Sequence, residues 1–174
     1  MTQLRRRALL GAALAFPFAA RGQSCGTPTP ADIEGPYYKA GAPARGSLIE
    51  PGSKAEKLVL SGMVRSADCK PLPGAKLDFW HADDRGNYDH TGNRYRGVVV
   101  ADAQGRYQLE TILPPPYSGR PRHIHVKLQR PGGRVLTTQL YFPGESRNEN
   151  AALVVKMDRS AGLLRASYDF TLRA

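Results

Sequence analysis

From Lys57 to the C-terminus the chain is a series of short runs in which apolar and polar residues alternate, separated by turns rich in glycine and proline. In RYQLETI, every second residue from Tyr107 to Thr111 has one character and the residues between have the other. A period of two places these sets on opposite faces of a β-strand. No convincing long amphipathic helix interrupts the series. The pattern predicts an all-β fold, a single β-sandwich of mostly antiparallel strands.

The N-terminal 22 residues have the pattern of a targeting segment. Arg5, Arg6 and Arg7 precede an apolar run from Ala8 to Ala20, which is short for a membrane span, and small residues follow. We expect residues 1–22 to be an export signal that resembles the twin-arginine type, with an ordinary secretory signal as the alternative. The protein would then be exported, periplasmic or extracellular, without stable membrane insertion after signal removal.

Residues 23–56 contain many Pro, Gly and Ala and no sustained period, so we expect an extended N-terminal arm that packs on a domain formed by residues 57–174. The chain has two cysteines, Cys25 and Cys69. An even count in an exported chain favours a disulfide between them. Lipid attachment at Cys25 is the weaker alternative, because the residues before it match a lipoprotein signal poorly.

The charge of the chain gives little support to nucleic-acid binding. The formal net charge is +10, and the four arginines of residues 1–22 account for +4, which leaves +6. The remaining basic residues are scattered, without a basic run or interleaved aromatic residues, so we expect no nucleic-acid partner. A positive field of this size suits anionic aromatic substrates.

The stretch YSGRPRHIH holds the strongest chemical signal in the chain. In a strand, His123 and His125 leave on one face and Ile124 points the other way, into a core. Two convergent imidazoles can share one metal ion, although an HxH pair by itself is more often an exposed or core pair. Tyr117 ends a run of three prolines and lies six positions before His123.

A set of ordered motifs makes the chain resemble the intradiol ring-cleavage dioxygenases, the family of catechol, hydroxyquinol and protocatechuate 3,4-type enzymes. The resemblance runs from about Glu34 to the C-terminus. Its motifs are EGPYY, LPGAKLDFWHADDRGNY, RGVVVADAQGRYQLETILPPPY, RPRHIH and TTQLYFPG.

This resemblance implies a non-haem Fe(III) site with four protein ligands, Tyr88, Tyr117, His123 and His125, and a hydroxide. It implies that Arg120 offsets negative charge on the substrate ring, that Gln139 lies beside the site, and that Tyr117 also acts as an internal base. The implied reaction uses O2 to cleave a small aromatic diol between its two hydroxyl-bearing carbons, giving a muconate-type diacid. Donor chemistry agrees, because phenolates are hard anionic donors that suit a trivalent ion, whereas zinc favours Cys, His and carboxylates.

The chain also departs from the family pattern. The stretch between Tyr117 and His123 is short, which predicts an open site and leaves substrate preference unassigned. There is no room for the N-terminal helical region of catechol-type members. The protein can still form a homo-oligomer, but the resemblance does not imply that it dimerises as catechol-type members do.

Two readings from other classes compete with the enzyme. One is a non-catalytic, transthyretin-like binding or carrier domain. The other is a carbohydrate or surface-binding module anchored by Trp80 and tyrosines, although we expect Trp80 to pack in a core. We expect His81 and His90 to lie beside the site or at the surface rather than to be ligands, and place Tyr37 and Tyr38 at the edge of the pocket.

Overall fold

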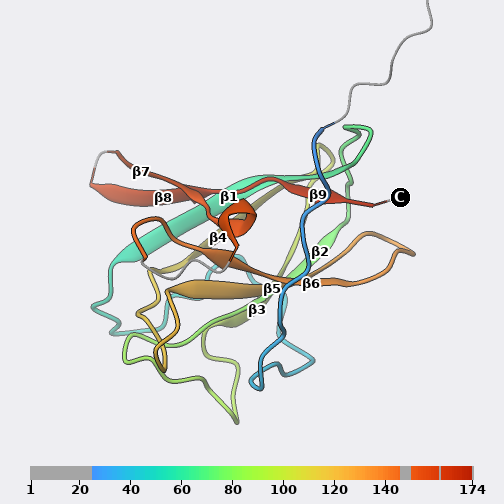
Figure 1. Cartoon of the computed structure of the whole chain (residues 1–174). Helices are drawn as coiled ribbons and strands as arrows, with labels where there is room; N and C mark the ends of the chain where they lie inside the picture. The colour runs from blue at the N-terminus through green and yellow to red at the C-terminus, as the bar shows by residue number, and fades with distance from the viewer. Residues whose placement is uncertain (1–24, 146–149, 161, 174) are drawn as a thin grey trace, which may run out of the picture.

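The computed structural model describes residues 25–145, 150–160 and 162–173. The expected export signal, residues 1–22, lies outside these ranges. Within them the regular elements are strands joined by loops and turns, with one short 3-10 helix (Figure 1). The elements are β1 (Lys57–Ser66), β2 (Lys76–Trp80), β3 (Arg96–Val100), β4 (Arg106–Ile112), β5 (His123–Gln129), β6 (Leu136–Tyr141), η1 (Ala151–Leu153), β7 (Lys156–Ser160), β8 (Leu163–Ser167) and β9 (Phe170–Leu172).

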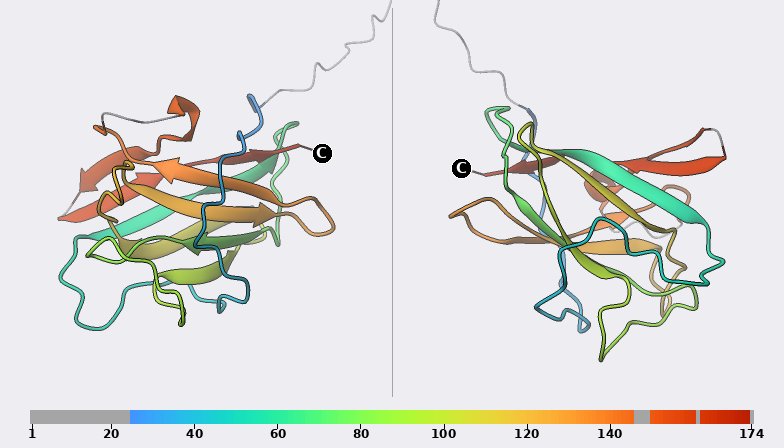
Figure 2. Two further views of the ribbon diagram at one scale, coloured as in Figure 1. Left: turned by 60° about the horizontal axis from the view of Figure 1, so that its bottom comes forward. Right: turned by 180° about the vertical axis from the view of Figure 1, so that it is seen from behind.

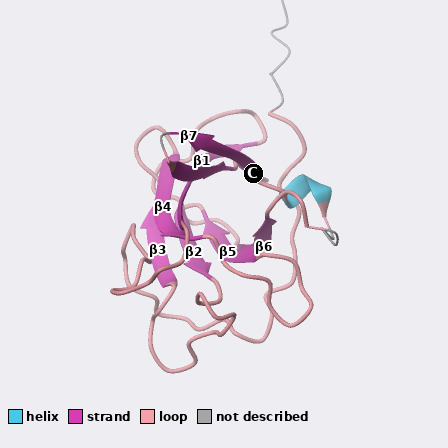
Figure 3. Ribbon diagram, turned by 90° about the vertical axis from the view of Figure 1, so that its left-hand side faces the viewer, coloured by secondary structure: helices cyan, strands magenta, loops and turns pink. Residues whose placement is uncertain are grey.

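The strands form two sheets, and the all-β sandwich predicted from the alternating pattern is confirmed. One sheet has the order β4-β1-β8-β7, with β9 also paired to β1, and the other has the order β3-β2-β5-β6. Pairing is antiparallel except where β1 meets β8 and β9. Figure 3 separates the two layers, with β1 and β7 in one and β2, β5 and β6 in the other. No helix in the described ranges is long and apolar enough to cross a membrane.

The hydrophobic core lies between the sheets and is built from the inward set of each alternating strand. In β5, Ile124, Val126 and Leu128 are fully buried in this core, as the alternation around Ile124 predicted. The opposite set of β5 begins with His123 and His125, which leave the sheet on its outer face. The fold therefore places the two histidines outside the sandwich interior.

The N-terminal arm runs across that outer face. The backbone N–H of Asp32 donates to Thr137 O on β6 (3.0 Å), and further along, the N–H of Val98 on β3 donates to Pro43 O (2.9 Å). The left view of Figure 2 shows this segment lying across the strands of the four-stranded sheet. The arm then pairs with the other sheet, where Leu48 N donates to Glu110 O (2.8 Å). It ties both layers together and covers the histidine face.

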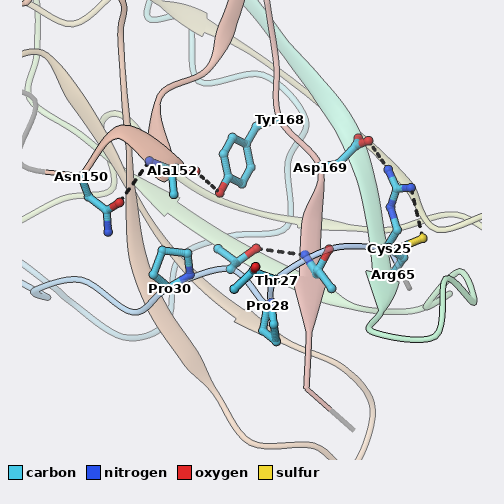
Figure 4. A pocket seen from close by; sticks show the side chains of 11 residues that line it. Cys25, Thr27, Pro28, Pro30, Arg65, Asn150, Ala152, Tyr168 and Asp169 are labelled. Atoms are coloured by element: carbon cyan, nitrogen blue, oxygen red, sulfur yellow. Dashed lines mark hydrogen bonds and ion pairs between the residues drawn. The ribbon is translucent and has the colours of Figure 1, made fainter. Parts of the chain in front are cut away.

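A disulfide between Cys25 and Cys69, the pairing favoured from the cysteine count, anchors the start of the arm. Beside it Arg65 donates to the Cys25 sulfur (3.7 Å) and forms an ion pair with Asp169 (Figure 4). The adjoining cavity has a volume of about 520 Å³, and Tyr168 lines its wall. The disulfide lies at the N-terminal end of the arm, away from β5 and its histidines.

Candidate metal centre

The imidazoles of His123 and His125 converge on the hydroxyl of Tyr88. Nε2 of His123 lies 3.2 Å and Nε2 of His125 lies 3.1 Å from the Tyr88 oxygen. The two rings are 4.8 Å apart and nearly perpendicular, at 80°. Both histidines and Tyr88 are at most 5% exposed. Three of the four predicted ligand side chains therefore bring their donor atoms to one point in a buried environment.

Hydrogen bonding orients the His123 ring for this role. Its Nδ1 lies 2.7 Å from the carbonyl oxygen of Pro121. Because a carbonyl only accepts, Nδ1 carries a proton, so in the neutral ring Nε2 keeps its lone pair, as in metal-ligating histidines whose other nitrogen is held by a carbonyl. Burial lowers the pKa of His125 well below its usual value. Burial thus favours the neutral form of the His125 ring, and the Pro121 carbonyl selects the His123 tautomer whose Nε2 faces the site.

Trp80 supports His125 from the neighbouring strand. The two residues are paired between β2 and β5, and their rings stack 4.8 Å apart with planes only 6° from parallel. Tyr38 from the arm packs on Trp80 in turn, with the two ring centres 4.9 Å apart. Trp80 is buried as expected, but in a smaller cluster with Ala82 and Tyr88 rather than in the core between the sheets.

The loop that carries Tyr88 is folded by its own polar residues. The Oδ1 atom of Asp83 accepts hydrogen bonds from the backbone N–H groups of Arg85 (2.9 Å) and Asn87 (2.8 Å). Gly86 occupies the position with φ of 80°, where a side chain would be strained. These short-range bonds turn the chain so that Tyr88 enters the site. Burial, the largest cause, raises the pKa of Tyr88 well above its usual value, so without a cation the phenol keeps its proton.

Tyr117, the fourth predicted ligand, is held by a tight turn and by the arm. Tyr117 and Arg120 pair across Ser118 and Gly119, which have φ of 45° and 76°, as expected for a two-residue hairpin turn. The Tyr117 ring lies 5.4 Å from the Tyr88 ring, edge to face. Its hydroxyl is hydrogen-bonded to that of Tyr37, and this bond is the main cause that raises the pKa of Tyr117.

Arg120 and Gln139 lie in a connected polar network beside the histidines. Nη2 of Arg120 donates to the hydroxyl of Tyr141 (3.1 Å), which donates to Oδ2 of Asp32 on the arm (3.0 Å). Gln139 is paired with His125 between β6 and β5, and its Nε2 donates to Ile33 O (2.7 Å). Arg120 is thus held at the site by Tyr141, while the amide of Gln139 holds the arm over the sheet.

Three residues contribute more to the site than the sequence patterns indicated. Tyr37 does more than edge the pocket, because its ring stacks 4.5 Å from Tyr88. Tyr141 is fully buried and shares a face with Gln139, so the period of two could have revealed it. Arg96 is buried at the start of β3, and an isolated arginine carries no signal of burial in a sequence.

The two remaining histidines do not join the donor atoms. His81 is buried, with Nδ1 2.7 Å from Ala82 O and Nε2 2.6 Å from Thr111 Oγ1. His90 is exposed and meets the Tyr37 ring edge-on at 5.2 Å. Among the described residues no group of three or more His, Cys, Asp or Glu side chains gathers at one place. The convergent set therefore mixes tyrosine with histidine, which fits a hard trivalent cation better than zinc.

Known proteins share both the sequence and the fold. A family model described as "Dioxygenase" matches residues 33–172. A chlorocatechol 1,2-dioxygenase of Pseudomonas sp. (strain P51) is 35% identical over 137 residues, covering 64% of this chain and 55% of that protein. A catechol 1,2-dioxygenase of Acinetobacter baylyi (strain ATCC 33305 / BD413 / ADP1) is 37% identical over 146 residues, covering 67% and 47%. The chain thus spans about half the length of these relatives.

Two solved structures extend the comparison. The dioxygenase domain of a dioxygenase carbohydrate-binding protein fusion from Streptomyces sp. SirexAA-E superposes with a TM-score of 0.82 and 46% identity, covering 85% of this chain and 99% of that one. The 3-chlorocatechol 1,2-dioxygenase from Rhodococcus opacus 1CP has a TM-score of 0.76 and 28% identity, covering 83% and 72%. The sandwich and its arm therefore correspond to nearly the whole of the Streptomyces domain.

Proposed function

This chain belongs to the intradiol ring-cleavage dioxygenase family, and from that premise we propose that it uses O2 to cleave a catechol-type ring between its two hydroxyl-bearing carbons. The product would be a muconate-type diacid. The observation that carries the proposal is the position of the Tyr88 hydroxyl within 3.2 Å of Nε2 of both His123 and His125. Burying three polar groups at one point costs stability that hydrophobic residues would not cost, so the convergence favours a functional role.

Four side chains would hold a ferric ion: Tyr88, Tyr117, His123 and His125. Two phenolates and two neutral imidazoles suit a trivalent cation, and the orientation of His123 by the Pro121 carbonyl supports a ligand role. Such an ion, when bound, draws electron density from a chelated diol and makes its ring reactive towards O2. The raised pKa of Tyr88 is consistent with this set, because a bound cation of high charge offsets the cost of the buried phenolate.

Tyr117 is suited to take a proton from the diol. It is half-buried, and it flanks a two-residue turn outside the core between the sheets. Its oxygen already shares a hydrogen bond with Tyr37, which gives the phenol a partner in the protonated state. We also propose that the guanidinium of Arg120, which donates to Tyr141, offsets negative charge that builds up on the substrate ring.

The two competing readings receive less support. A carrier without chemistry gives no reason for all four ligand positions to be present and for three of their donor atoms to converge. A carbohydrate module anchored by Trp80 would need an exposed ring, and Trp80 is 1% exposed and stacked on His125.

We propose that the protein is exported to the periplasm or beyond, from the pattern of its first 22 residues.

Iron content and oxygen uptake test the proposal directly. Purified protein loaded with iron should hold about one ferric ion per chain, show a visible phenolate-to-iron charge-transfer band, and consume O2 with a panel of catechols while muconate absorbance rises. The aromatic diol that gives the highest kcat/KM would identify the substrate class. Protein that stays colourless and iron-free after loading, and consumes no O2 with any diol, would refute the proposal.

A further inference from the structure

Arg96 is a buried charge that the reaction outlined above does not use. It is 2% exposed and opens β3 at the edge of the four-stranded sheet. Strand pairing sets it in one row with three residues of the outer face. In the order of the sheet, the row is Arg96, Trp80, His125 and Gln139. A buried guanidinium is costly unless it is paired, so its presence beside the site calls for a reason.

The hydrogen bonds of Arg96 do not neutralise it. Nη2 donates to the backbone carbonyl of Asp89 (2.8 Å), the residue next to Tyr88. Within the described part of the chain, Nε and Nη1 are buried without a hydrogen-bond partner, and no carboxylate forms an ion pair with this side chain. The guanidinium therefore anchors the Tyr88 loop through an uncharged acceptor and keeps its full positive charge.

The nearest acids have other partners. The carboxylate of Asp89 accepts hydrogen bonds from the backbone N–H groups of Thr91, Gly92 and Arg94, which fold its own loop. Asp78 accepts the hydroxyl of Tyr38 (3.2 Å), and its burial raises its pKa. Both attract Arg96 only at longer range. Arg96 also lowers the pKa of Tyr88, in opposition to burial, as does Arg120 from the Tyr117 turn.

We propose that Arg96 is a positioning residue for Tyr88: it fixes the Tyr88 loop through the Asp89 carbonyl and keeps an unneutralised positive charge beside that loop. This inference rests on the proposed function, because Tyr88 carries negative charge only as a ligand of a ferric ion. A positive charge close to a phenolate stabilises the electrons on its oxygen. It therefore raises the energy needed to move one of those electrons to iron, which is the energy that the visible charge-transfer band reports.

The chain supplies a matched control in Arg45, on the arm. Nε of Arg45 donates to Arg96 O (2.9 Å), and Nη2 donates to Asn93 O. Arg45 thus holds the same loop as Arg96 through backbone carbonyls. It differs in that its side chain is 32% exposed and pairs with Glu50 (3.5 Å). Replacing Arg45 loosens the loop without removing a buried charge from the site.

The test compares R96Q, R96K and R45Q in the full-length, iron-loaded protein, after circular dichroism has shown which variants are folded. The glutamine of R96Q keeps a donor for the Asp89 carbonyl and lacks the charge, whereas the lysine of R96K keeps the charge and lacks the planar fork. We expect R96Q to move the charge-transfer maximum to longer wavelength, on the order of 10 nm for one lost charge at a buried site. R96K and R45Q should stay near the wild-type wavelength.

Three results would overturn the inference. The first is a folded, iron-loaded R96Q with the wild-type band. The second is an R45Q band that moves as far as that of R96Q, which would assign the effect to the loop alone. The third is an R96K band that moves to longer wavelength although the charge is kept, and this result decides the matter if R96Q does not fold. Wild-type protein without iron or a band would instead refute the proposed function, independently of Arg96.

Discussion

The hydroxyl of Tyr37 on the N-terminal arm is hydrogen-bonded to the hydroxyl of Tyr117, a residue 80 positions later in the chain. The Tyr37 ring also stacks on Tyr88. The arm is therefore part of the candidate metal centre as well as its cover. We therefore expect a change that displaces the arm to alter the positions of Tyr88 and Tyr117 more than the packing of the sandwich core.

Replacing Tyr117 with Phe should damage both colour and turnover. The variant keeps the ring and loses the oxygen that would bind iron and take a proton. We expect a shifted charge-transfer band and a kcat that falls about a hundredfold to ten-thousandfold, the usual loss for a positioned acid–base group. Tyr168→Phe is the control, because the Tyr168 hydroxyl donates to Ala152 O, beside the disulfide cavity. Equal spectra and rates for Tyr117→Phe and wild type would remove Tyr117 from the ligand set.

Replacing Tyr141 with Phe should lower kcat and leave iron content unchanged. The substitution removes the hydroxyl that links Arg120 to Asp32, and it keeps the buried ring. A lost hydrogen bond to a charged group supports a decrease of roughly tenfold. Steady-state kinetics with iron quantified in the same samples measures this. A kcat equal to that of wild type would show that Arg120 does not depend on Tyr141.

Two glycines of the arm separate backbone strain from contact with the site. Gly35 has φ of 72°, and an added Cβ would lie 3.3 Å from Cε1 of His125. Gly41 has φ of 87° and no heavy atom within 4 Å of such a Cβ. Alanine at either position should cost about 1–2 kcal/mol of unfolding free energy. Gly35→Ala alone should also weaken iron retention and activity, so similar activities for the two variants would contradict the predicted contact.

The burial of His81 predicts a loss of stability in mild acid. Its Nδ1 donates to Ala82 O and its Nε2 accepts from Thr111, so the folded state holds the neutral ring, and burial lowers its pKa to about 4. The unfolded chain gains a proton near the ordinary pKa of about 6.5. The contribution of the neutral His81 ring to the free energy of unfolding is therefore fully present above pH 6.5. It is lost as pH falls towards 4, by about 3 kcal/mol.

Chemical denaturation across that pH range measures the effect. His81→Asn, which can still donate to Ala82 O, should be less stable at neutral pH but should lose less stability on acidification than wild type. An unchanged pH slope in His81→Asn would assign the acid sensitivity to other groups.

Reducing the disulfide should lower stability more than activity. The bond joins residues 44 positions apart, a separation for which loss of the crosslink costs about 2–4 kcal/mol. The arm keeps its other attachments near the site, such as the Asp32–Thr137 and Val98–Pro43 backbone bonds. We expect the Cys25→Ser, Cys69→Ser double variant to unfold at a lower temperature and to retain most of its kcat at room temperature. A large loss of kcat in folded double variant would show that the anchor also sets the site.

Local patterns predicted the parts of this structure that depend on neighbours in sequence. The alternation around Ile124 predicted a core residue between two outward histidines, and the turn residues predicted the breaks between strands. The ordered motifs led to Tyr88, Tyr117, His123 and His125 as ligands through resemblance to a family. The structure brings Tyr88 to both histidines and Tyr117 to Tyr88.

The other contacts at the site depend on the order of strands in the four-stranded sheet, and no local sequence pattern specifies that order. Arg96 and His125 share a row only because β2 lies between β3 and β5. Tyr37 reaches Tyr88 only because the arm crosses that sheet. Trp80 lies on the outer face of β2, opposite the core residues Leu77 and Phe79, and the arm buries it there with Tyr38. Burial by a distant segment has no period that a sequence can display.

The position of the histidines on the outer face separates two kinds of evolutionary constraint. Substitutions between the sheets are limited by packing and say nothing about which molecules can enter. The arm and the two loops that carry Tyr88 and Tyr117 can exchange side chains, lengthen or shorten while the sandwich keeps its volume. A scaffold of this kind can acquire new specificities through changes in the arm and the two loops, and these segments are the natural target for redesign.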